Sequence, residues 1–304
     1  MEKWTLKHMD DLQGKVIIVT GGNSGLGFES VKAFAGKGAS VVLASRNMQK
    51  GEEAKAEILK AHPAGKIEVL GLDLMDLESI RTFVQQFEEK HARLDVLLNN
   101  AGIMTTPYFT TKDGFEGQMG TNHLGHFALT AQLMGRIKST PGSRVVNVSS
   151  NGHRFGKMDF DNLLFEDGKD YTPMKAYGRS KLANLLFTYE LQRHLESSGM
   201  DAIAVAAHPG ASRTNLDRYL KGKFWYYLLW PLAYLMTMGQ DQGALPQIRA
   251  SVDEQVKGGQ YYGPHRSMTG YPVLVASNKA SHSREDARKL WELSEKLTGV
   301  TFAF

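Results

Sequence analysis

The sequence contains no cysteine among its 304 residues. A chain without thiols has no disulfide framework, no cysteine nucleophile and no cysteine-ligated zinc. Its ten histidines include no His-Glu-x-x-His pair, so we expect no metal site. Stability must therefore come from a buried core. A chain of this length can bury about 75% of its unfolded surface, and 42% of its residues are hydrophobic.

The sequence also lacks a block of charge of one sign. Its 36 Lys and Arg residues are dispersed among 32 Asp and Glu residues, for a net charge of +4. Nucleic-acid binding needs a basic stripe or patch, so we do not expect it. No Pro- or Ser-rich linker, low-complexity run or internal repeat divides the chain. We therefore predict a single domain over residues 1–304.

Long hydrophobic runs are missing as well. Residues 1–14 are charged and polar, without the apolar stretch of a secretory signal, so a cytoplasmic location is expected. The most apolar segment, 224–238, has only 15 residues and contains Pro231, so it is too short to span a bilayer. It could be a lid over an apolar substrate, an interface between copies of the chain, or a peripheral membrane contact.

Short β-branched runs alternate with helical segments along the chain. Lys15–Thr20 ends at two glycines, which indicates a buried strand followed by a tight turn. Residues 52–59 and 80–87 show helical spacing of apolar positions. This alternation predicts a Rossmann-type, doubly wound α/β fold of three layers, with ligands beyond the carboxyl ends of the strands. The other predicted strands are 41–44, 67–72, 96–98, 145–148 and 203–207.

The loop after the first strand is rich in glycine. Thr20–Gly27 reads TGGNSGLG and leads into an apolar helix, so its backbone could approach a pyrophosphate at the helix N-terminus. The alternative is a simple strand-to-helix turn. The spacing differs from G-x-G-x-x-G, so this loop alone does not identify a nucleotide site.

Several ordered motifs together resemble the short-chain dehydrogenase/reductase family. Thr20–Gly27 is similar to its TGxxxGxG motif, and the remaining motifs follow in the family's order over residues 14–275. The separation of 27 positions between Ser150 and Tyr177 resembles that in the branch of retinol dehydrogenases and their bacterial relatives. The remaining motifs are Asn99-Asn100-Ala101-Gly102, Asn122, Val148-Ser149-Ser150, Tyr177-x-x-x-Lys181 and His208-Pro209-Gly210 with Thr214.

The resemblance implies a nicotinamide cofactor, and the second strand indicates which one. NAD-binding folds place an acid near the end of this strand, whereas here Ser45 stands at that position and Arg46 offers a planar cation suited to phosphate. We therefore predict NADP(H) over NAD(H), with Asn99 as structural support for the adenine pocket. The residues expected to contact the cofactor are Gly21, Asn23, Ser24, Gly25, Leu26, Gly27, Ser45, Arg46, Asp73, Leu74, Asn100, Ala101, Gly102, Tyr177, Lys181, Pro209, Gly210 and Thr214.

Tyr177 and Lys181 lie four positions apart in a predicted helix, so they share a face. An adjacent ammonium should lower the pKa of the phenol from its usual value of ~10. The resemblance implies that Tyr177 transfers a proton to the carbonyl oxygen while Ser150 hydrogen-bonds it. It also implies that Lys181 holds the nicotinamide ribose and that Asn122 supports a water beside it. Strand alternation allows only one of Ser149 and Ser150 to face the site, and the family pattern favours Ser150.

Ser150 and Tyr177 are 27 positions apart. Many family members have about half that separation, so residues 152–173 are an inserted loop. The predicted function is an NADP(H)-dependent oxidoreductase that interconverts an alcohol and a carbonyl on an apolar aldehyde, ketone or retinoid-like substrate, with a substrate lid at about 211–240. The alternative is a non-catalytic nucleotide-binding regulatory or interaction protein on the same fold.

Overall fold

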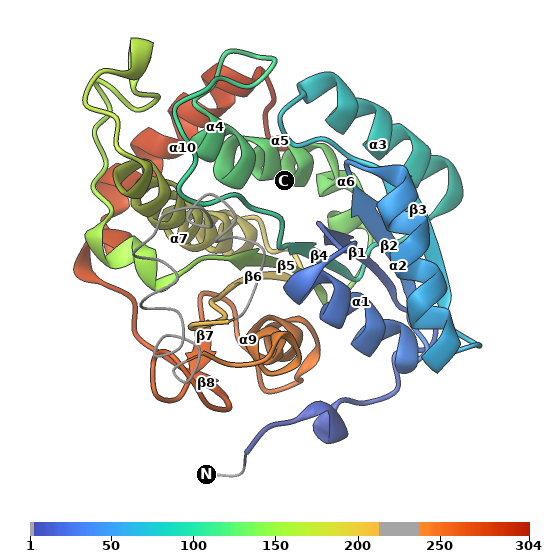
Figure 1. The fold of residues 1–304 in the computed structure, drawn as a ribbon. Coiled ribbons are helices and arrows are strands. Elements are labelled where there is room, and N and C mark those ends of the chain that lie inside the picture. Colours follow the sequence, from blue (N-terminus) through green and yellow to red (C-terminus); the bar gives the residue numbers. More distant parts are fainter. Residues whose placement is uncertain (1–2, 213–236) are drawn as a thin grey trace.

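An eight-stranded sheet runs through the centre of the computed structural model, which describes residues 3–212 and 237–304 (Figure 1). The strand order is β3-β2-β1-β4-β5-β6-β7-β8. The first seven strands are parallel, and β8 pairs antiparallel with β7. The strands are β1 (Val16–Thr20), β2 (Ser40–Ser45), β3 (Lys66–Gly71), β4 (Val96–Asn99), β5 (Ser143–Val148), β6 (Ala202–Ala207), β7 (Tyr261–Pro264) and β8 (Pro272–Leu274).

Helices cover both faces of the sheet (Figure 1). On one face pack α1 (Gly25–Gly36), α2 (Met48–Ala61) and α9 (Gln240–Val252). On the other pack α3 (Leu77–Lys90), α5 (Gly125–Gln132), α6 (Met134–Lys138), α7 (Pro173–Ser197) and α10 (Arg284–Thr298). Shorter helical segments are α4 (Gly117–Met119), a π-turn at Gly120–Leu124, and 3₁₀ turns at Leu6–His8, Asn151–Phe155, Glu166–Gly168 and Lys279–His282. This is the predicted doubly wound α/β fold.

Aromatic packing fixes the second helical layer and the chain's last residues. The Trp291 ring of α10 lies 5.3 Å from the ring of Phe127 in α5 and 4.4 Å from that of Phe302. The Phe127 and Phe187 rings, from α5 and α7, are 5.3 Å apart. Phe302 therefore packs into the core on this face of the sheet.

Each of the six predicted strands is present and differs from its expected bounds by at most two residues at either end. The short strands β7 and β8 were not predicted. The segment 261–271 begins with β7, which extends the sheet beyond β6. Thr214 and almost all of 224–238 lie outside the described residues. Among the described residues, no helix is long and apolar enough to cross a membrane.

The order of strands reverses at β1, which pairs with β2 on one side and β4 on the other. Chain connections leave this point in opposite directions, so a crevice opens at the carboxyl ends of the strands. The two loops that border it are joined by Thr20, whose Oγ1 accepts hydrogen bonds from the amides of Asn100 and Ala101, both at 2.9 Å. The Asn100 side chain donates in return to the Thr20 carbonyl at 2.7 Å.

We predict that Thr20→Val lowers the free energy of unfolding by about 2–4 kcal/mol, because it leaves the two amides without their acceptor in a buried place. Thr20→Ser keeps the hydroxyl and should cost only about 1 kcal/mol for the lost methyl group. Denaturant unfolding of both variants measures the difference. A Thr20→Val variant as stable as the parent, with a loss confined to Thr20→Ser, would mean that the methyl packing, and not the hydrogen bonds, holds the two loops together.

Candidate active site

The loop between β1 and α1 needs glycine at specific positions. Gly21 and Gly25 have φ values of +66° and +59°, in the left-handed region. A Cβ on Gly27 would lie 2.3 Å from the Gly21 carbonyl oxygen, so the helix and the loop could not pack as they do. The Ser24 side chain makes no capping bond to α1, which leaves the first amides of this helix facing the crevice.

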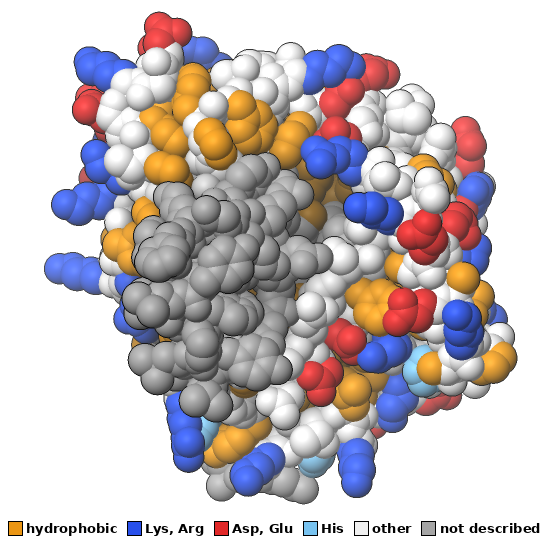
Figure 2. Space-filling model, viewed as in Figure 1, with side chains coloured by type: hydrophobic (Ala, Val, Ile, Leu, Met, Phe, Trp, Pro, Cys, Tyr) orange, Lys and Arg blue, Asp and Glu red, His pale blue; other side chains and the backbone are white. Residues whose placement is uncertain are grey.

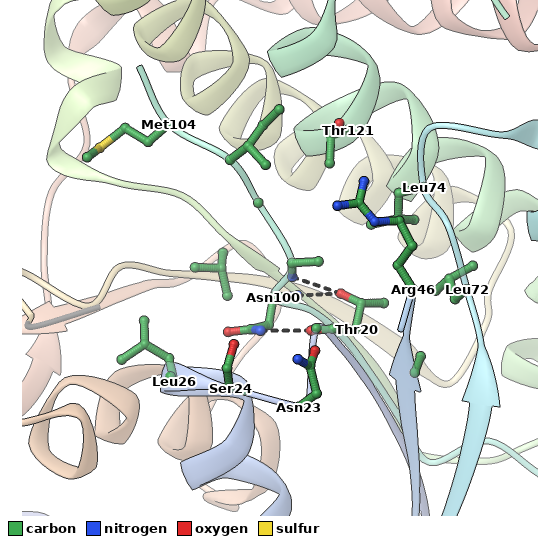
Figure 3. A pocket seen from close by; sticks show the side chains of 18 of the residues that line it. Thr20, Asn23, Ser24, Leu26, Arg46, Leu72, Leu74, Asn100, Met104 and Thr121 are labelled. Atoms are coloured by element: carbon green, nitrogen blue, oxygen red, sulfur yellow. Dashed lines mark hydrogen bonds between the residues drawn. The ribbon is translucent and has the colours of Figure 1, made fainter. Parts of the chain in front are cut away.

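A pocket at the carboxyl ends of the strands brings together most of the residues predicted to bind the cofactor (Figure 3). Met75, Ile103, Met104 and Thr121 also line it, and the sequence motifs did not predict them. Of the residues predicted to bind the cofactor, Ser45 and Gly210 do not line it, and Thr214 lies outside the described residues. Of the predicted catalytic residues, Asn122 and Ser150 do not line it, whereas Ser149 does. The predicted residues that do line it are Gly21, Asn23, Ser24, Gly25, Leu26, Gly27, Arg46, Asp73, Leu74, Asn100, Ala101, Gly102, Tyr177, Lys181 and Pro209.

Ser45 faces α2 instead of the pocket. Its hydroxyl donates to the Asn47 carbonyl at 3.0 Å, and a Cβ on Gly51 of α2 would lie 3.5 Å from the Ser45 Cβ. Its neighbours Ala44 and Arg46 line the pocket. Strand alternation explains this difference, since successive side chains point to opposite faces. The Ser45 side chain therefore does not line the pocket, in contrast to that of Arg46.

Arg46 reaches into the pocket from the end of β2. Figure 3 shows its guanidinium beside Leu74, across the pocket from Leu26. The side chain is exposed, and its Nη1 lies 3.5 Å from the Met75 sulfur. Asp73 accepts a hydrogen bond from the Met75 amide at 3.0 Å, whereas the N-cap of α3 is Asp76.

Tyr177 and Lys181 lie near the start of α7, where both side chains are buried. Burial raises the pKa of Tyr177, and a hydrogen bond with the Ser150 side chain only partly offsets this effect. Burial lowers the pKa of Lys181 to about 8. The Lys181 Nζ lies 5.9 Å from the centre of the Tyr177 ring and donates to the Val148 carbonyl at 3.0 Å. The expected lowering of the Tyr177 pKa by this ammonium is absent, because desolvation dominates.

The two neighbouring serines have different partners. The Ser149 hydroxyl donates to the Lys181 carbonyl at 2.7 Å and ties β5 to α7, whereas the Ser150 Oγ accepts from the Gly152 amide at 3.1 Å and its side chain lowers the pKa of Tyr177. His153, which the motifs did not single out, supports Ser150 from behind. Its Nδ1 lies 2.6 Å from the Ser150 carbonyl oxygen, and its own carbonyl accepts from the Asn278 side chain at 3.1 Å.

Asn122, in the π-turn before α5, clamps the chain after β4. Its Oδ1 accepts from the Ile103 amide at 2.8 Å, and its Nδ2 donates to the Ile103 carbonyl at 3.0 Å. A Cβ on Gly102 would lie 3.1 Å from the Asn122 Oδ1 and 3.4 Å from the Lys181 Nζ. Asn99 points elsewhere and donates to Asn147 at 2.8 Å inside the sheet. Asn122 thus fixes the backbone beside Lys181.

The comparisons with known proteins agree with this geometry. The family model for short chain dehydrogenases matches residues 15–163. Human retinol dehydrogenase 11 is 41% identical over 293 residues, covering 95% of this chain and 87% of the relative. Mouse retinol dehydrogenase 12 is 38% identical over 291 residues, covering 95% and 88%. The crystal structure of an uncharacterized protein from Mycobacterium paratuberculosis superposes with a TM-score of 0.84 at 39% identity and covers both chains fully.

The chain therefore belongs to the short-chain dehydrogenase/reductase family. Within it, the chain lies in the branch that is similar to the retinol dehydrogenases. It is an oxidoreductase that acts on alcohol and carbonyl groups, and its family uses nicotinamide dinucleotides as cofactors.

We predict that Lys181→Met stabilises the fold at neutral pH. The folded-state pKa of about 8 lies below 10.5, the usual value for a lysine in the unfolded chain. Burying the ammonium therefore costs stability below pH 8, by at most about 3 kcal/mol. Between these two pKa values the unfolded state binds more protons, and the parent's stability therefore rises with pH. The Val148 carbonyl keeps a second donor, the Asn184 side chain at 3.1 Å.

Denaturant unfolding of the parent and Lys181→Met at several pH values between 7 and 10.5 tests this expectation. The gain in the free energy of unfolding of the variant over the parent should be largest at pH 7. It should disappear as the pH approaches 10.5, the usual pKa of a lysine. A variant that is less stable than the parent by a constant amount at every pH would show that the ammonium is not desolvated.

Proposed function

We propose that this chain is an NADP(H)-dependent oxidoreductase that interconverts the alcohol and carbonyl forms of an apolar aldehyde, ketone or retinoid-like molecule. The observation that carries the proposal is the pocket that brings the glycine loop together with the buried Tyr177 and Lys181, with the Lys181 Nζ 5.9 Å from the centre of the Tyr177 ring. The curated relatives named retinol dehydrogenases, at 36–41% identity, support an apolar substrate. Cytoplasmic location and self-association remain predictions from the sequence.

The pocket fits a dinucleotide. Gly21, Gly25 and Gly27 permit the close backbone approach that a pyrophosphate requires, next to the uncapped N-terminus of α1. Asp73 and Leu74 would border the adenine, and Lys181 would hold the nicotinamide ribose. When bound, the reduced cofactor supplies a hydride.

The protein's own part is to bind the carbonyl oxygen and move one proton. The Ser150 side chain is close enough to Tyr177 to lower its pKa, so one oxygen atom could contact both hydroxyl groups. Because burial raises the pKa of Tyr177, the phenol is protonated at neutral pH and can act as the acid in reduction. The buried Lys181 places positive charge beside the negative charge that develops when this proton leaves.

The preference for NADP(H) rests on Arg46. Its exposed guanidinium extends from the end of β2 into the pocket and can form paired hydrogen bonds with phosphate oxygens (Figure 3). No carboxylate stands at the end of this strand, where it would repel a 2′-phosphate, because residues 44–47 are Ala, Ser, Arg and Asn.

We predict that Tyr177→Phe lowers kcat by roughly 10² to 10⁴-fold, the range for loss of a general acid, and leaves the Kd for NADPH within a few-fold of the parent. Tyr189→Phe is the matched control. This tyrosine also belongs to α7, but its hydroxyl pairs with Ser277, and it does not line the pocket.

Steady-state reduction of a panel of aldehydes and ketones, with NADPH binding measured by fluorescence, provides both values. Near-parent turnover in Tyr177→Phe would contradict its role as the acid. A parent that binds NADPH but turns over no carbonyl or alcohol in the panel would favour the alternative of a non-catalytic nucleotide-binding protein.

We also predict that Arg46→Ala weakens NADPH binding by about 1.5–3 kcal/mol, the range for hydrogen bonds to charged groups. NADH lacks the 2′-phosphate and serves as the internal control, so its Kd should hardly change. Calorimetric titration of parent and variant with both cofactors measures the four constants. Parallel losses for NADPH and NADH, or equal affinities in the parent, would mean that Arg46 does not recognise the phosphate.

A further inference from the structure

The inserted loop 152–173 contacts one wall of the pocket. Ile103 and Met104 line this wall, and we name residues 103–106 the strap (Figure 3). The strap follows Gly102, where a Cβ would lie 3.4 Å from the Lys181 Nζ. It therefore begins beside the proposed reacting groups. In Figure 3 Met104 lies far from Arg46, so it borders the part of the pocket away from the adenosine side.

Side chains from two other segments hold the strap beyond Ile103. The Thr105 amide donates to the Gln118 Oε1 at 2.9 Å, and the Thr106 carbonyl accepts from the Tyr171 hydroxyl at 2.7 Å. Thr105 has a φ of 52°, in the left-handed region that a threonine rarely adopts. The strap therefore depends on these hydrogen bonds to keep an unfavourable backbone conformation.

Gln118 and Tyr171 also hold each other. The Gln118 Nε2 donates to the Tyr171 hydroxyl and to the Pro173 carbonyl, both at 3.0 Å. The Gln118 side chain is fully buried. Pro173 is the first residue of α7, four positions before Tyr177. The pair thus connects the strap to the beginning of the helix that carries Tyr177 and Lys181.

Packing between aromatic rings holds Tyr171 in position within the inserted loop. The Tyr171 ring packs edge-on against the rings of Tyr108 and Phe165, each with centroids 5.4 Å apart. The Arg179 guanidinium lies 3.9 Å from the centre of the Phe165 ring. It also donates to the Asn162 carbonyl at 2.6 Å. Arg179 belongs to α7, so helix and loop behave as one support.

We propose that Gln118 and Tyr171 are positioning residues that fix the strap and its Met104, and that this position sets which apolar substrates the pocket accepts by size. The inference rests on the proposed function and extends it. Ile103 is held separately by Asn122, so loosening the strap beyond Ile103 should leave the cofactor's part of the pocket unchanged. The effect is therefore on the substrate and not on NADPH.

Tyr171→Phe is the direct test, because it removes the hydroxyl and keeps the ring packing. We expect the ratio of kcat/KM for a long over a short straight-chain aldehyde to change by about three- to tenfold, the loss expected for a hydrogen bond, mainly through KM. The Kd for NADPH should stay within twofold of the parent, a difference of about 0.4 kcal/mol. Amide hydrogen exchange at 103–109 should become faster, most clearly at Thr105.

Tyr108→Phe is the matched control. This tyrosine packs on the same ring, and no hydrogen bond of its hydroxyl is recorded among the described residues. Its substrate ratio and its exchange at 103–109 should equal those of the parent. If Tyr171→Phe gives the same substrate ratio and the same exchange as Tyr108→Phe, the Tyr171 hydroxyl does not position the strap, and the proposal fails.

Met104→Ala provides a second route if Tyr171→Phe does not fold. It shortens the wall directly and should change the same substrate ratio without weakening NADPH binding. An unchanged ratio in Met104→Ala, or a Tyr171→Phe variant that loses NADPH affinity and both substrates equally, overturns the proposal. If the parent turns over none of the aldehydes, the proposed function is contradicted instead. The positioning role can still be tested in that case, because unchanged amide hydrogen exchange at 103–109 in Tyr171→Phe would overturn it.

Discussion

The hydrogen bonds around Thr20 are the constraint on which the site depends. They join the carboxyl ends of β1 and β4, where the glycine loop and the strap-bearing loop begin. The Asn100 side chain also accepts from Gln247 of α9 at 2.9 Å, so a helix from the other end of the sequence secures the same junction. The glycine loop and the strap-bearing loop therefore start from one rigid point, and the sheet, not a ligand, fixes the distance between them.

Burial controls the proton chemistry at the other end of the pocket. It raises the pKa of Tyr177 and lowers that of Lys181, so each side chain is shifted towards its neutral form. The hydrogen bond from the Lys181 Nζ to the Val148 carbonyl limits the cost of this desolvation, and the Ser150 side chain partly offsets the rise in the pKa of Tyr177. The site thus keeps a phenol that can donate a proton and an ammonium that deprotonates easily.

Much of the fold and most of the pocket could be predicted because their signals are local. The alternation of short β-branched runs and helices predicted the sheet, and Thr20–Gly27 and Tyr177-x-x-x-Lys181 each place their residues through one loop or one helical turn. The misses depend on contacts between distant segments. The direction of Ser45 depends on its packing against α2, and the pKa of Tyr177 depends on total burial. The pair of Gln118 and Tyr171 spans 53 positions, which no sequence spacing indicates.

The helical geometry of α7 explains how an inserted loop can be attached next to a reaction site. Residues four apart share a helix face, whereas a residue midway between them points to the opposite side. Tyr177 and Lys181 thus face the pocket, and Arg179 faces away, where it binds the carbonyls of Asn162 and Leu163. The loop is anchored to the opposite side of the helix and contacts the strap through Tyr171. Its sequence can therefore change the substrate wall while the proton-transferring side chains stay in place.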